Sequence, residues 1–166
     1  MAPEQEKIAQ VRATALNHVS ISSRDLEESA RFYEELFGFE RLPTPTFSVP
    51  VVWLRVGDQQ LHLFQQHQSE APQFHHIGLE VDDFEAFYLR LEELGIRDPA
   101  WFSSIYELPS GEVQMYLRDP GGNLVEIDWP DARTLDRAII TDLRKLADDQ
   151  PQAPGAENAS LFTARA

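Results

Sequence analysis

Four side chains that can bind a metal ion stand at matching places in two similar stretches of this sequence. His18 opens the first stretch and His76 opens the second. Each stretch closes with two apolar-rich runs joined by a turn, and the fourth residue after the turn is His62 in one and Glu126 in the other. Imidazole together with carboxylate suits Zn, Ni, Mn, Fe and Co. We therefore predict that these four residues hold one divalent metal ion.

Such a metal site would leave coordination positions free for substrate oxygens, which the ion can polarise. Glu126 supports the prediction, because an unpaired carboxylate buried in a short apolar strand is costly and needs a metal, a basic partner or water. Two ordinary alternatives exist. Each histidine could be a strand residue with its hydrogen bonds satisfied, and Glu126 could face solvent on an edge strand. The equivalent placement of all four residues favours the metal site.

Two predicted β-hairpins position His62 and Glu126. The first joins VVWLRV to QQLHLF through Gly57-Asp58, and the second joins VQMYLR to NLVEID through the turn DPGG. Apolar-rich runs around turns of this composition are typical of hairpins. Because side chains alternate along a strand, Glu126 and Asp128 share one face of the second hairpin.

A strand and a helix precede each hairpin. The runs LNHVSIS and FHHIGLEV, which contain the two histidines, are predicted strands. Asp25 and Asp83 each lie seven residues beyond the histidine and are predicted helix N-caps, while Gly38 and Gly95 end the helices. The order strand, helix and three strands therefore occurs twice in the chain.

We predict an α+β fold in which two βαβββ modules form one domain. The length of 166 residues suits a single domain with a sizeable core. The chain is divided as follows: an N-terminal leader at 1–14, the domain at 15–130 with modules 16–66 and 75–128, an amphipathic C-terminal helix at 131–148, and a disordered tail at 149–166.

Composition excludes several functions. The chain has no cysteine, so disulfides, thiolate metal sites and a cysteine nucleophile are ruled out. A net charge of −14 argues against partners with phosphate backbones or anionic membrane surfaces. There is no lysine between Lys7 and Lys145 to form a Schiff base or bind a phosphate. No apolar run is long enough to span a membrane and no signal peptide is recognisable, so a cytoplasmic location is expected.

Three segments resemble one protein family: NHVSISSRDLEESARFYEELFGFE, HHIGLEVDDFEAFYLRLEELGI and MYLRDPGGNLVEID. They are similar to the vicinal oxygen chelate superfamily, which includes glyoxalase I, extradiol dioxygenases, methylmalonyl-CoA epimerase and the fosfomycin- and bleomycin-resistance proteins. The resemblance covers about residues 15 to 130. It implies that the two modules curl their sheet into a cleft, often within a homodimer, and that the ligand places fall on His18, His62, His76 and Glu126.

No branch of the superfamily fits in every position. Extradiol dioxygenases resemble the chain in Tyr116, ten residues before the glutamate, but their acid–base histidine is absent from positions 107–109. Bacterial glyoxalase I would have an arginine where Ser22 stands. Fosfomycin thiol transferases have a threonine at the place of Ser20 and use a lysine that this domain lacks. Bleomycin-binding members have no metal ligands.

The resemblance implies a metal-dependent enzyme for a small molecule with two adjacent oxygens. We rank lyase or isomerase chemistry through a metal-stabilised enediolate first, with Glu126 alternating between ligand and base. Tyr116, on the strand hairpinned to Glu126, would donate a hydrogen bond to a substrate oxygen; alternatively it packs in the core with its hydroxyl satisfied elsewhere. The other hypotheses are ring-cleaving dioxygenation, fosfomycin-type thiol transfer and metal-free drug binding.

Overall fold

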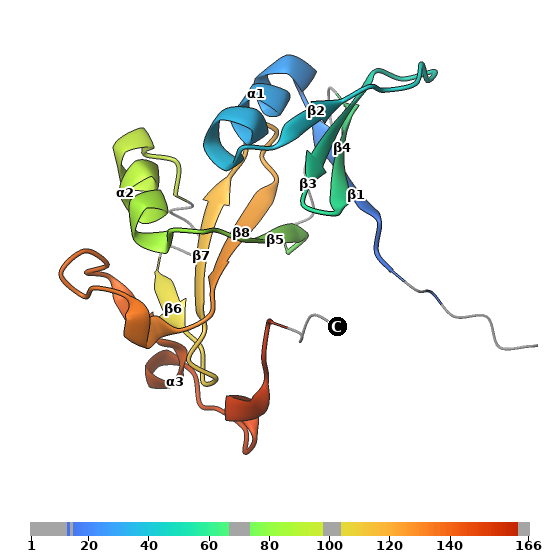
Figure 1. The fold of residues 1–166 in the computed structure, drawn as a ribbon. Coiled ribbons are helices and arrows are strands. Elements are labelled where there is room, and N and C mark those ends of the chain that lie inside the picture. The colour runs from blue at the N-terminus through green and yellow to red at the C-terminus, as the bar shows by residue number, and fades with distance from the viewer. Residues whose placement is uncertain (1–12, 14, 67–73, 98–103, 163–166) are drawn as a thin grey trace, which may run out of the picture.

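The protein is described by a computed structural model that covers residues 13, 15–66, 74–97 and 104–162. Two βαβββ modules follow one another along the chain, as the sequence predicts (Figure 1). The first consists of β1 (His18–Ser23), α1 (Leu26–Phe37), β2 (Glu40–Leu42), β3 (Val51–Val56) and β4 (Gln59–Gln65). The second consists of β5 (His76–Glu80), α2 (Phe84–Leu94), β6 (Ile105–Glu107), β7 (Val113–Arg118) and β8 (Leu124–Trp129).

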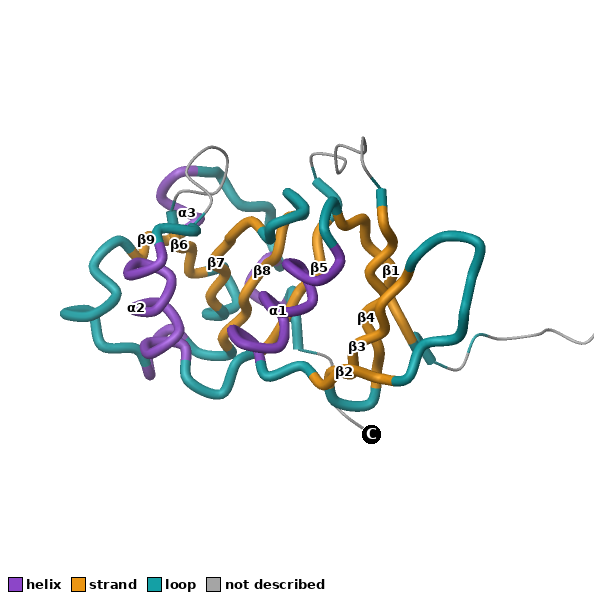
Figure 2. The backbone as a smooth tube through the Cα atoms, turned by 90° about the horizontal axis from the view of Figure 1, so that it is seen from above, coloured by secondary structure: helices purple, strands orange, loops and turns teal. Residues whose placement is uncertain are grey.

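Each module forms its own mixed sheet. The first sheet has the strand order β1-β4-β3-β2. The second has the order β5-β8-β7-β6-β9, in which β9 (Leu143–Lys145) is added after the module. Figure 2 shows the two sheets side by side, with β1 and β5 as the neighbouring edges. The α+β fold with two modules and an open, curved sheet is thus confirmed.

The two main helices begin and end where their caps predict. The Asp25 side chain accepts a hydrogen bond from the backbone N–H of Glu28 at 2.9 Å, and Asp83 caps α2 in the same way. Gly38 and Gly95 follow the helices with φ angles of 68° and 64°. This left-handed conformation is open to glycine at little cost, so both helices stop there.

The turn of the second hairpin joins the two modules. Tyr33 of α1 donates a hydrogen bond to buried Asp119 at 2.9 Å. The side-chain amide of Asn123 donates to the carbonyl oxygen of Ser22, at the end of β1, at 2.8 Å. A Cβ atom at Gly121 would lie 2.9 Å from that same carbonyl, so this close approach requires glycine.

The prediction for residues 131–148 is wrong, because they do not form one long helix. They form η1 (Ala132–Thr134), β9 and the four-residue α3 (Leu146–Asp149). Asp131 and Asp136 each accept a hydrogen bond from a backbone N–H two residues further on, which competes with helical bonding. The edge of β6 then takes β9 as a parallel partner.

The sequence analysis predicts an N-terminal leader at 1–14 and a disordered tail at 149–166, and the structure describes more of the tail than of the leader. The described part of the C-terminal tail contains η2 (Ala156–Asn158) and contacts the domain, since Ser160 and Leu161 both donate hydrogen bonds to the carboxylate of Glu112. Apart from residue 13, the predicted leader lies outside the described residues. Among the described residues, no helix is long and apolar enough to cross a membrane.

Candidate metal and active site

The first module brings His18 and His62 together. Ser20 of β1 pairs with His62 of β4, and His18 lies two residues earlier on the same face. The two imidazole rings stack, with their centroids 4.4 Å apart and their planes at 15°. Trp53 of β3 stacks on the other side of His62, also at 4.4 Å and at 7°. His62 therefore sits between two parallel rings.

The second module brings His76 and Glu126 together by the same register. Gly78 of β5 pairs with Glu126 of β8, and His76 again lies two residues earlier. Nε2 of His76 is 3.2 Å from Oε2 of Glu126. Tyr116 of β7 stands opposite Glu126, as Trp53 stands opposite His62. The repeat predicted from counting residues is therefore present in the strand pairing.

Glu126 is only 4% exposed, and several polar groups surround its carboxylate. Gln114 donates its side-chain N–H to Oε1. Tyr116 is hydrogen-bonded to the carboxylate, and its pKa is raised, first by burial and then by this bond and the negative charge. The sequence analysis predicts that a buried Glu126 needs a polar partner, and His76, Gln114 and Tyr116 are the partners that the structure shows. Tyr116 packs in the core with its hydroxyl on Glu126; a contact with substrate stays a prediction.

The predicted four-residue site is present as two separate pairs. Within the described residues, no three His, Asp or Glu side chains gather closely enough to hold a metal ion together. One pair lies on each sheet, and in each pair one side chain is buried and the other exposed: His62 and Glu126 are buried, whereas His18 and His76 are exposed. Binding of one ion by all four residues therefore stays a prediction.

The donor atoms of the two pairs fit a metal ion unequally. Two ligands about 2.1 Å from one ion, at right angles, lie about 3.0 Å apart, and the 3.2 Å between His76 and Glu126 is close to that value. The lone pairs of an imidazole lie in the ring plane, so the parallel rings of His18 and His62 do not converge on one point. His62 is also held by Gln60, 2.8 Å from its Nε2, whereas exposed His18 has room to turn.

Asp128 is a member of the site that the sequence analysis did not single out. It lies on the face of Glu126 and is 9% exposed, and its Oδ1 has no hydrogen-bond partner among the described residues. Burial, followed by the negative charge of Glu126 and a hydrogen bond with it, raises the pKa of Asp128 to about 8. Gly78 leaves room beside it, because a Cβ there would lie 3.1 Å from Asp128 Oδ2. The sequence signal that could have identified Asp128 was period-two alternation, which puts it on the same strand face as Glu126.

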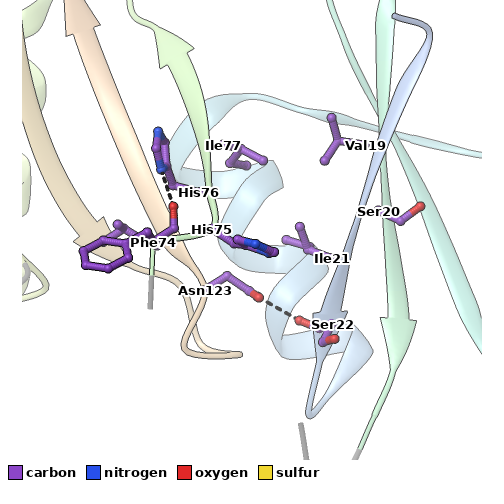
Figure 3. A pocket seen from close by; sticks show the side chains of 10 residues that line it. Val19, Ser20, Ile21, Ser22, Phe74, His75, His76, Ile77 and Asn123 are labelled. Atoms are coloured by element: carbon purple, nitrogen blue, oxygen red, sulfur yellow. Dashed lines mark hydrogen bonds between the residues drawn. The ribbon is translucent and has the colours of Figure 1, made fainter. Parts of the chain in front are cut away.

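Two cavities adjoin these pairs. One of about 490 Å³ lies between β1 and β5; Figure 3 shows His75 and Asn123 directed into it, while His76 turns away and hydrogen-bonds the carbonyl of Phe74. A second cavity, of about 510 Å³, opens beside His18 and His62. Ser20 lines both cavities, which lie at β1.

Paired βαβββ modules with histidine and carboxylate side chains on their strands define a class of metal-binding and small-molecule-binding proteins. The family model described as "Glyoxalase/Bleomycin resistance protein/Dioxygenase superfamily" matches residues 15–127. The chain belongs to this superfamily.

Named relatives support the assignment. Human mitochondrial methylmalonyl-CoA epimerase is 30% identical over an alignment of 127 residues, and the match covers 68% of this chain and 72% of that protein. The crystal structure of lactoylglutathione lyase from Agrobacterium tumefaciens is 25% identical with a TM-score of 0.54, over 70% of this chain and 93% of that one. A fosfomycin resistance protein from Listeria monocytogenes, in complex with Mn(II) and sulfate, shares the fold at a TM-score of 0.57 and 14% identity, over 70% and 93% of the two chains.

Proposed function

We propose that this protein is a divalent-metal-dependent enzyme of the lyase or isomerase type, acting on a small molecule with two adjacent oxygens. The observation that supports it most is the buried Glu126 carboxylate, which lies 3.2 Å from His76 and is oriented by Gln114 and Tyr116. The relatives named as an epimerase and a lyase favour chemistry at a carbon next to a carbonyl group. Within that class we propose epimerisation: removal of a proton by Glu126 from one face of that carbon and addition of a proton from solvent to the opposite face.

The residues that would hold the metal are His18, His62, His76 and Glu126. When bound, a divalent ion would polarise the carbonyl oxygen and so make the neighbouring C–H bond more acidic. The Phe74 carbonyl holds Nδ1 of His76 and so leaves its Nε2, beside Glu126, as the atom that would face an ion. His18 is the exposed member of the first pair, so its ring is the one that would turn toward the ion. We also propose that the protein forms a homodimer, as is common in this superfamily.

The second module is proposed to handle the proton. Glu126 accepts it from the substrate carbon, because its carboxylate is fixed within an apolar strand where water does not compete for it. Gln114 and Tyr116 keep the carboxylate in one orientation through their hydrogen bonds. Tyr116 would also donate its O–H to a substrate oxygen placed beside Glu126 and so position the molecule for proton transfer.

A metal-free binding protein is the second candidate function. The parallel rings of His18 and His62 favour it, because stacked imidazoles present a flat surface to a ligand rather than converging lone pairs. Metal analysis of protein purified without added metal separates the two candidates. About one equivalent of bound metal supports the enzyme, and no metal with no effect of a chelator supports the binding protein.

The enzyme is tested by loss of the proton next to the carbonyl in D₂O, followed by NMR with methylmalonyl-CoA as the first probe and a hemithioacetal as the second. We expect metal-dependent exchange, abolished by a chelator and by Glu126→Gln, which also weakens metal binding because a neutral amide replaces the only anionic ligand. Glu93→Gln, at an exposed position of α2, is the matched control and should leave exchange unchanged. Equal exchange in the Glu126 variant would overturn its role as base.

A further inference from the structure

We propose that the first module provides an aromatic subsite, formed by Phe47, Trp53 and Phe64, that binds a planar aromatic or heteroaromatic group of the ligand. The subsite lines the cavity of about 510 Å³ that opens beside His18 and His62. It rests on the proposed function in one respect: the substrate's oxygens would lie at the histidines while its planar group lies among these three rings.

The shared register of the two modules shows how far their faces have diverged. Three matched positions are polar in the second module and apolar in the first: Tyr116 and Trp53, Asp128 and Phe64, Gln114 and Val51. The match is reversed beside the histidines, where Gln60 of the first module stands at the place of Leu124. The face around His62 is therefore the more apolar one at these three positions, and Gln60 adds an amide to it.

The cavity beside these rings has room for another ring. Phe47 is 47% exposed, and its centroid is 5.9 Å from that of Trp53 with the planes at 42°, so these two rings already contact each other. A ligand ring would therefore lie in the cavity beside the pair, against Phe47 and Phe64, rather than between Phe47 and Trp53. Val49, on the same loop, is also exposed. A planar ligand would cover apolar surface that water now meets.

The indole N–H of Trp53 indicates that the ligand's planar group carries an acceptor. It is buried and has no hydrogen-bond partner among the described residues. The loop that carries Phe47 is tied to β3 by the hydroxyl of Thr44, which accepts a hydrogen bond from the backbone N–H of Trp53 at 3.1 Å. A ligand that enters the subsite with an oxygen or ring nitrogen on its planar group would supply an acceptor for the unpaired indole N–H. A heteroaromatic or acyl-substituted ring is therefore preferred over a plain hydrocarbon.

The subsite belongs to the first module and lies on the face of His18 and His62. Ser20 lines this cavity and also the cavity next to His76, but its side chain is directed away from His75 and Asn123 (Figure 3). The subsite would select substrates by the group attached to the reacting carbon, while the His76 and Glu126 pair performs the same chemistry on each.

The test compares three hydroxamates, whose adjacent oxygens bind divalent metals, on Zn-loaded protein by calorimetric titration. Benzohydroxamate should bind three- to tenfold more tightly than cyclohexanecarbohydroxamate, and acetohydroxamate should bind most weakly. Phe47→Leu keeps an apolar side chain but removes the ring, and it should reduce the advantage of benzohydroxamate to less than twofold. Leu89→Ala, at an exposed leucine of α2 outside both cavities, is the control and should keep it.

A second measurement separates failure of the subsite from failure of the proposed function. In metal-free protein, benzamide should shift the Trp53 indole signal in ¹H–¹⁵N spectra, and Phe47→Leu should weaken that binding. Metal-dependent hydroxamate binding with no preference for the phenyl group, and no benzamide shift, would overturn the subsite and leave the metal enzyme standing. Hydroxamate binding that is indifferent to metal would overturn the enzyme, and the benzamide shift would still decide the subsite.

Discussion

The raised pKa of Asp128 gives a prediction for stability against pH. The folded protein holds the Asp128 proton up to about pH 8, whereas the unfolded chain releases it near 3.8. Unfolding between these values therefore releases a proton, and the free energy of unfolding falls as pH rises through this window. Below the window both states are protonated and above it both are ionised, so the loss is complete above about pH 8. Asp128→Asn, which keeps the shape of the protonated acid, should remove this loss.

The magnitude follows from the width of the window. About four pH units at about 1.4 kcal/mol per unit set a ceiling near 6 kcal/mol. The negative charge of Glu126 contributes to the shift, and the two carboxyl groups share that cost, so we expect a gain on the order of 2–3 kcal/mol for the variant at pH 9. At pH 4 the variant and the parent should be equally stable.

Urea unfolding of metal-free protein in EDTA at several pH values measures this difference. Glu93→Gln, at an exposed carboxylate, is the control and should follow the parent at every pH. Parallel stability curves for Asp128→Asn and the parent from pH 4 to pH 9 would refute the reasoning, because they would show that Asp128 ionises alike in both states.

Two further predictions concern the site and the joint between the modules. Tyr116→Phe should leave folding and metal content intact and reduce kcat by about 10²–10³, the usual cost of one lost stabilising donor; full activity would make the hydroxyl merely a core group. Gly121→Ala should destabilise the protein by about 1–3 kcal/mol in urea unfolding, because its Cβ would lie 2.9 Å from the Ser22 carbonyl. An unchanged unfolding midpoint would show that the turn and β1 can separate freely.

Local signals in the sequence predicted most of the fold. Asp25 and Gly38 bound α1 through contacts within a few residues, so their roles can be inferred without tertiary information. Period-two alternation put Glu126 and Asp128 on one face of the strand for the same reason, but it did not decide whether that face is buried. Local signals gave the wrong prediction for residues 131–148. Their apolar spacing is helical, but part of the segment forms β9, which pairs with β6, a strand distant in sequence.

The site was predictable in its residues but less so in its arrangement. Counting from the turns identified His62 and Glu126 as equivalent, and the strand pairing agrees. The stacking of Trp53 on His62 depends on side-chain rotation, which spacing does not reveal. The raised pKa of Asp128 depends on burial and on a neighbouring charge, so only the folded chain shows it.

The strand pairing has a consequence for insertions and deletions. The hairpins keep the same register although their connections differ, with two residues between β3 and β4 and the longer 119–123 between β7 and β8. Turn length can therefore change over evolution without moving His62 or Glu126. A one-residue insertion inside β4 or β8 is different, because every later side chain in that strand would change faces. Natural length variation should collect in the turns and avoid these two strands.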